Sequence, residues 1–122
     1  HIPMWDFDNV ALDRVKEALR RIQTRFFLSN ILILRSSEPD NYIAYCFTAR
    51  DWREVVAIIA ETELVDWNFF KYGVYRERFT LRVSPKRVEK PKLVATLEGY
   101  ELANCSPEDL NSWVRYETLK GE

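Results

Sequence analysis

The stretch ILILRSSEPDNYIAYCF, residues 31–47, contains two short apolar segments that flank a turn. The first, residues 31–34, is too short for a helix and half of it is β-branched, which indicates a buried strand. Residues 36–41 combine Ser, Glu, Pro, Asp and Asn, most of which favour turns. Residues 42–47 form the second apolar segment. We therefore predict that a β-hairpin lies within the fold.

A helix is predicted on each side of this hairpin. Upstream, within residues 10–26, apolar side chains recur at spacings of three and four, which is typical of an amphipathic helix. These side chains are Leu12, Val15, Leu19, Ile22 and Phe26. Downstream, residues 48–51 form a capping-box pattern with Asp51 in place of the commoner Glu. This pattern predicts the start of a second helix, which we expect to end near Glu63.

Two further strands are predicted beyond these helices. Trp5 and Phe7 alternate with acidic residues, and residues 78–83 alternate polar with apolar side chains until Pro85. Residues 64–70 between the second helix and this strand are ambiguous. The resulting order, β-α-β-β-α-β, is typical of ferredoxin-like and RNA-recognition folds of the α+β class. We expect both helices to cover one face of an antiparallel sheet, which leaves the other face for function or further packing.

The length of 122 residues suits a single domain, which we place at residues 4–122. Residues 4–87 form the predicted core, and residues 88–122 form a C-terminal extension. Within the extension, we expect residues 93–97 and 100–103 to form a hairpin. Residues 106–109, SPED, predict a last helix because they combine an N-cap, a Pro and two acids in the first turn.

The net charge of the chain is close to zero, but its charges are unevenly distributed. The 18 Lys and Arg residues face 19 Asp and Glu residues, a net charge of −1. Between Lys71 and Lys92, eight basic residues face two acidic ones, a local net charge of +6 that leaves −7 for the rest. One strongly basic segment on a neutral chain favours a polyanionic partner such as DNA or RNA. The alternative is a solvated strand and loop.

The cysteines and the hydropathy exclude two other classes. Cys46 and Cys105 lack metal-ligand spacing and the single histidine is His1, so a Cys/His zinc site is excluded. We expect two reduced thiols, with a single bridge between them as the alternative. Each apolar run is far shorter than the roughly 20 residues of a membrane-spanning helix. We therefore expect a cytoplasmic protein with no membrane role.

Three carboxylates are candidate metal ligands. Asp6 and Asp8 lie two apart on a predicted strand, so they share a face at roughly 6.6 Å along the backbone. Paired carboxylates at this spacing suit Mg²⁺ or Mn²⁺, which align oxygens in phosphoryl transfer. Asp66, after the second helix, would be a third ligand. The alternatives are a solvated strand face with Asp8 as a helix cap, and a loop position for Asp66. Ser36 and Ser37 suit either phosphate contact or a turn.

In this order, the features resemble the catalytic half of the archaeo-eukaryotic primase superfamily, which includes the primase-polymerases of archaeal plasmids and viruses. That family builds its palm on an RNA-recognition-like sheet with a D-x-D pair, a histidine segment and a later single acid. The resemblance covers residues 4–87. It implies that Asp6, Asp8 and Asp66 are catalytic, metal-binding acids and that Arg82 lies near nucleotide phosphates. Ile43 stands where the family histidine is expected, which predicts a reduced, catalytically inactive descendant.

The basic segment adds a nucleic-acid-binding surface to this hypothesis. Its cations neutralise phosphates, and Tyr72 and Tyr75 stack unpaired bases if they are exposed rather than packed in a strand. The predicted nucleic-acid-binding residues are Lys71, Tyr75, Arg76, Arg78, Arg82, Lys86 and Arg87. The sequence thus predicts an inactive, primase-like nucleic-acid-binding domain in the replication or regulation of a mobile element. One alternative is an active Mg²⁺- or Mn²⁺-dependent nucleotidyltransferase. Another is a protein interaction module that forms a homodimer or binds a replication protein.

Overall fold

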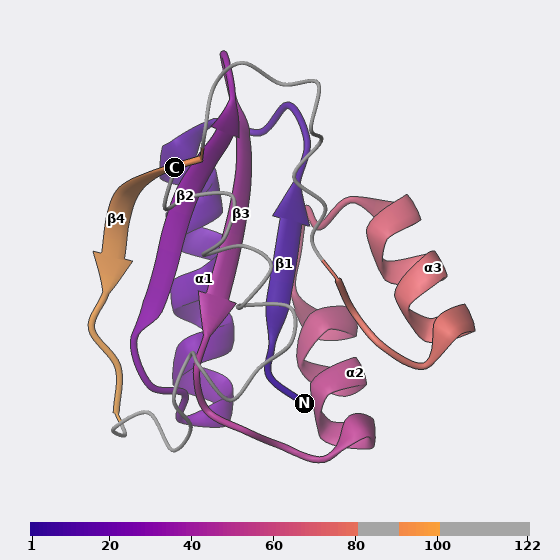
Figure 1. Ribbon diagram of the computed structural model, residues 1–122. Helices are drawn as coiled ribbons and strands as arrows, with labels where there is room; N and C mark the ends of the chain where they lie inside the picture. Colours follow the sequence, from indigo (N-terminus) through magenta and orange to yellow (C-terminus); the bar gives the residue numbers. More distant parts are fainter. Residues whose placement is uncertain (81–90, 101–122) are drawn as a thin grey trace.

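A computed structural model describes residues 1–80 and 91–100 of the chain. Within these residues, strands of one sheet are combined with helices, which confirms the α+β class (Figure 1). The elements are β1 (Met4–Phe7), α1 (Leu12–Phe26), β2 (Ile31–Ser37), β3 (Asn41–Cys46), α2 (Trp52–Glu61), α3 (Trp67–Arg76) and β4 (Lys92–Leu97). The hairpin, the first strand and the first two helices follow the predicted segments.

The described strands form an antiparallel sheet in the order β1-β3-β2-β4. β3 is antiparallel to both β1 and β2, so β1 and β2 run in the same direction with β3 between them. The β1-α1-β2 segment is therefore a split β-α-β unit, as in the first half of a ferredoxin-like fold. The full ferredoxin-like order is not confirmed, because β4 pairs with β2, from Arg35 opposite Lys92 to Ile31 opposite Leu97.

The segment between α2 and residue 80 differs from the prediction. Residues 67–76 form helix α3, and Asp66 caps it by accepting a hydrogen bond from the Phe69 N–H at 2.9 Å. The helix ends at Glu77, which adopts a left-handed conformation with φ of 60°. Arg78–Thr80 are not a strand, and the rest of the predicted strand, residues 81–83, lies outside the described residues.

Helices α1 and α2 cover one face of the sheet (Figure 1). Val15, Leu19 and Ile22 of α1 are buried there, as the apolar spacing predicts. On the same side, the Trp5 indole N–H donates to Thr62 Oγ1 at the end of α2 across 2.9 Å. Ala11, without a side-chain capping bond, occupies the N-cap position of α1, so Asp8 is not the cap of this helix.

The other face of the sheet is also apolar. Leu34, Ile43, Tyr45 and Phe47 are each at most 7% exposed. The rings of Tyr45 and Phe47 stack with centroids 6.0 Å apart. We expected this face to serve either function or further packing. The burial of its side chains favours packing.

The remaining expectations are partly covered by the described residues. Cys46 is a buried free thiol, whereas Cys105 lies outside these residues. β4 matches the first strand of the expected C-terminal hairpin; the second strand and the last helix lie in the segment that is not described. In residues 1–80 and 91–100, no helix combines the length and the apolar character needed to cross a membrane.

Candidate nucleic-acid interface

Helix α3 is attached to the first strand at its N-terminus. The backbone N–H of Asp66 donates to the backbone carbonyl of Asp6 across 2.8 Å. The carboxylate of Asp66 points back into the helix and accepts from the N–H of Phe69. These two bonds fix where α3 begins, at the edge of the sheet formed by β1, as Figure 1 shows.

The inner side of α3 packs on an aromatic cluster centred on Phe79. The Phe79 ring centroid lies 5.1 Å from that of Trp52 in α2 and 5.3 Å from that of Phe69. Gly73 is buried at this contact, and a Cβ atom there would overlap the Phe79 ring. The N–H of Arg78 donates to the Gly73 carbonyl at 3.0 Å, so the chain turns back over the helix end. Gly73 thus allows Phe79 to hold α3 against α2.

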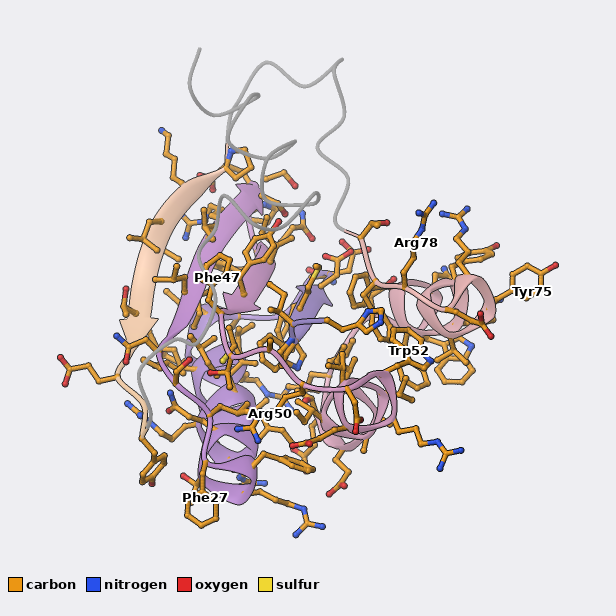
Figure 2. All side chains as sticks on the ribbon, turned by 60° about the horizontal axis from the view of Figure 1, so that its bottom comes forward. Phe27, Phe47, Arg50, Trp52, Tyr75 and Arg78 are labelled. Carbon is orange, nitrogen blue, oxygen red and sulfur yellow. The ribbon has the colours of Figure 1, made fainter. Side chains whose placement is uncertain are left out.

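The outer side of α3 presents aromatic and basic side chains together. Trp67, Tyr72 and Tyr75 are 66%, 52% and 83% exposed. Three exposed cations accompany them: Lys71, Arg76 and Arg78. Figure 2 shows Tyr75 pointing away from the body of the molecule, with Arg78 at the same end of the helix. We call the six residues Trp67, Lys71, Tyr72, Tyr75, Arg76 and Arg78 the aromatic–basic face.

Two of the three cations of this face lie against the Tyr72 ring. Lys71 Nζ is 5.2 Å and Arg76 Cζ is 5.8 Å from the centroid of the Tyr72 ring. Contacts of this kind are cation–π interactions, which orient long basic side chains at a surface. The face is therefore partly preorganised by its own residues.

Four of the predicted nucleic-acid-binding residues, Lys71, Tyr75, Arg76 and Arg78, are brought together here. The other three, Arg82, Lys86 and Arg87, lie outside the described residues. Trp67 was missed as a candidate ligand contact. The sequence feature that could have identified Trp67 is its spacing of four residues from Lys71, which is in turn four residues from Tyr75. This spacing places the three side chains near one another only if the segment forms a helix that starts after Asp66.

The three candidate metal ligands do not form a metal site. The backbones of Asp6 and Asp66 meet, but the Asp66 carboxylate caps α3 and Asp8 is exposed beyond the end of β1. Within the described part of the chain, which includes all three residues, no cluster of three acidic, Cys or His side chains could hold a metal ion. The Asp66 carboxylate is thus engaged as a helix cap in this structure.

Ile43 stands directly opposite Asp6 in the β1–β3 pairing. Side chains of directly opposed residues lie on the same face of a sheet, so Ile43 and Asp6 are neighbours. Ile43 is only 5% exposed. The resemblance predicts a histidine beside an acid. At this position the chain has the buried side chain of Ile43 beside the half-buried side chain of Asp6.

The serines at the hairpin turn lie among acidic residues. Ser37 Oγ accepts a hydrogen bond from Asn41 Nδ2 at 2.9 Å, and Asn41 Oδ1 accepts from the backbone N–H of Asn9 at the same distance. The turn also carries Glu38 and Asp40, whose charges repel phosphate. The bond of Ser37 is that of a turn residue, and residues 36–41, which form this turn, include no cation.

Arg35, which directly precedes this turn in the sequence, is engaged within the protein. Its guanidinium donates to Tyr42 Oη at 3.1 Å and pairs with Glu38 at 3.6 Å. The hydrogen bond to Tyr42 raises the pKa of Arg35, with smaller contributions from Glu38 and Asp40. Arg35 is therefore permanently charged and its charge is compensated locally.

Comparisons of the chain with protein-family models, with curated proteins and with solved structures gave no match.

Proposed function

We propose that this chain is a nucleic-acid-binding domain that uses the aromatic–basic face of α3. The observation that carries the proposal is the exposure of three aromatic rings and three cations together on α3 and the turn that follows it. Lys and Arg side chains neutralise backbone phosphates with little dependence on sequence. Exposed rings provide surfaces on which bases stack. The face therefore combines the two interactions that bind a nucleic-acid strand.

The distribution of ion pairs supports this use of α3. Among the described residues, ion pairs involve Arg21, Arg25, Arg35 and Arg50, and none involves a cation of the aromatic–basic face. From residue 67 to residue 80 the only acid is Glu77. The cations of this face thus remain available to an anionic partner, although the chain as a whole is nearly neutral.

The exposed aromatic rings of α3 also support the nucleic-acid-binding proposal. Large aromatic side chains that stand in solvent at 66% and 83% exposure mark interaction sites more often than inert surface, especially when they cluster. A helix side that only faces solvent would carry charged and small polar residues at positions 67 and 75.

The relation to a primase-like palm is a second part of the proposal. The split β-α-β unit and the position of Ile43 opposite Asp6 support a palm of the RNA-recognition type in which the expected histidine has been lost. The Asp66 carboxylate, which accepts from the Phe69 N–H as a helix cap, supports a domain in which this acid has a structural role. Such a domain would act in the replication or regulation of a mobile element through binding alone.

A polarisation titration tests binding. Labelled single-stranded and double-stranded DNA and RNA are titrated at about 50 mM and about 200 mM salt. The variant Lys71→Gln/Arg76→Gln is compared with Arg14→Gln/Arg53→Gln, which removes two exposed cations from α1 and α2. We expect salt-sensitive binding that the α3 variant weakens by about tenfold and the control leaves nearly unchanged. No binding to any strand, or equal loss in both variants, would overturn the proposal.

A protein partner is the competing function for the same surface. Trp67, Tyr75 and the exposed Val74 would suit a protein interface, where aromatic residues are enriched. Sedimentation at increasing protein concentration separates the two. A dimer that Tyr75→Ala dissociates, together with no affinity for nucleic acid, would replace the nucleic-acid proposal with this one.

A further inference from the structure

Three residues of the aromatic–basic face form a column along α3. Trp67, Lys71 and Tyr75 are four residues apart, so they lie one above another in the order ring, cation, ring. With a rise of 1.5 Å per residue, about 6 Å of helix separates each ring from the cation and about 12 Å separates the two rings. A nucleic-acid strand likewise alternates bases and phosphates along its length.

The rings of this face are not equally available. Lys71 and Arg76 occupy the neighbourhood of the Tyr72 ring through their cation–π contacts. Tyr75 makes no ring or cation–π contact within residues 1–80 and 91–100, and it is the most exposed large hydrophobic side chain there. The Trp67 ring touches only the edge of the cluster, with its centroid 5.9 Å from that of Phe70 at an interplanar angle of 37°. Trp67 and Tyr75 are thus the rings that a base can reach.

The spacing of the column favours an unpaired strand. Neighbouring bases of a stacked duplex strand are about 3.4 Å apart, whereas bases stacked on Trp67 and Tyr75 would be about 12 Å apart. A strand that uses both rings must therefore be extended, with bases splayed away from one another. A duplex hides its base faces, and a helix that reads its major groove presents amides and guanidinium groups to base edges. In the column of α3, by contrast, the rings of Trp67 and Tyr75 flank Lys71. Rings suit the exposed base faces of an unpaired strand rather than base edges in a groove.

We propose that the aromatic–basic face binds an extended single strand of nucleic acid without sequence preference, a refinement that rests on the proposed function. Bases stack on Trp67 and Tyr75, and Lys71 binds a phosphate between them. Tyr72 is a positioning residue that holds Lys71 and Arg76 in place. The absence of sequence preference follows because every base has a face for stacking and every nucleotide has a phosphate.

The first test compares a single strand of about 20 nucleotides, longer than the usual site size, with its duplex at one salt concentration. We expect the single strand to bind at least about tenfold more tightly. Tyr75→Ala should weaken single-strand binding by about tenfold or more and leave weak duplex binding unchanged, whereas Tyr75→Phe should bind as the parent does. Tyr100→Ala, at an exposed tyrosine elsewhere, is the matched control and should have no effect.

The second test uses tryptophan fluorescence, which detects stacking directly. A single strand should quench the emission, and Trp67→Phe should remove most of the quenching while it retains most of the affinity. Circular dichroism of each variant verifies the fold. Equal, salt-sensitive binding of single strand and duplex would overturn this inference and leave the proposed function intact. Binding to neither would overturn both.

Discussion

At the residue scale, Gly73 has a stability effect opposite to that of an ordinary helical glycine. Gly→Ala inside a helix normally stabilises a protein by up to about 1 kcal/mol. Here an added Cβ would overlap the Phe79 ring. We expect Gly73→Ala to lower the free energy of unfolding by about 1–3 kcal/mol, the usual range for overpacking, as measured by urea denaturation.

A double variant separates overpacking from other causes. Phe79→Leu shortens the side chain that Cβ would meet, so the added cost of Gly73→Ala should shrink when both changes are combined. Val74→Ala, at an exposed neighbour in the same helix, is the control. A Gly73→Ala protein that is as stable as the parent would contradict the contact.

Asp66 offers a second test at this scale, because the cap and the metal-ligand roles predict different outcomes. As the N-cap of α3, Asp66 accepts from the Phe69 N–H, and Asn can accept in the same way. We therefore expect Asp66→Ala to cost about 1 kcal/mol of stability and Asp66→Asn only a few tenths, measured by thermal unfolding.

The corresponding cap of α2 is the internal reference for this prediction. Asp51 accepts from the Glu54 N–H at 2.8 Å, so Asp51→Ala should cost about as much as Asp66→Ala. The addition of Mn²⁺ should raise the melting temperature of neither the parent nor Asp66→Asn. A Mn²⁺-dependent stabilisation that Asp66→Asn abolishes would restore the metal-ligand role.

At the element scale, Gln23 connects α1 to the loop that precedes β2 and to the end of β4. It is fully buried, and its Nε2 donates to the carbonyls of Ser29 and Leu97, each at 3.0 Å. Gln23→Met keeps the approximate volume but leaves both carbonyls without this donor. We expect a loss of about 1–3 kcal/mol, because unsatisfied buried acceptors are costly.

Hydrogen exchange locates this loss. The amides of β4 should lose protection more than those of β3, because Leu97 is at the end of β4 whereas β3 is held between β1 and β2. Thr24→Ala, at the exposed neighbouring position, is the control. Unchanged protection of β4 in Gln23→Met would show that Gln23 does not hold this strand.

Sequence patterns predicted the elements in which the spacing of apolar residues matches the spacing of the side chains that are buried in the structure. The hairpin and α1 follow this rule, as do β1 and α2. Helix α3 does not, because half of the residues in WNFFKYGVYR are aromatic, a type that favours strands. Its helix depends on the Asp66 cap and on the Gly73–Phe79 contact, which is tertiary. The position of β4 beside β2 also depends on long-range bonds, such as that from Gln23 to Leu97.

The candidate site shows the same division. Charge counting located Lys71, Arg76 and Arg78 without any knowledge of structure. Their arrangement required the helix, because residues 72 and 75 lie on opposite faces of a strand but one turn apart on a helix. For the acids, the order of elements suggested a third carboxylate from Asp66 near Asp6. The structure joins the two backbones, but the Asp66 carboxylate caps α3, a bond that spacing does not predict.

At the scale of the whole molecule, ion pairing determines which cations can act on a partner. On α1, Arg21 pairs with Glu17 and Glu63, and Arg25 pairs with Glu61. These pairs neutralise the surface between α1 and α2. The cations of α3 are not paired in this way within the described residues. A chain with a net charge of −1 can therefore present one locally positive surface to an anionic strand.

The salt dependence of binding measures how many of these cations reach phosphates. For single strands, the logarithm of the binding constant falls with the logarithm of salt concentration with a slope of about −0.7 per neutralised phosphate. Contacts from Lys71, Arg76 and Arg78 should together give a slope of about −2. Lys71→Gln should make the slope shallower by about 0.7, whereas Arg25→Gln, at a paired cation, should leave it unchanged. A slope near zero, or equal changes in the two variants, would show that α3 does not bind phosphates.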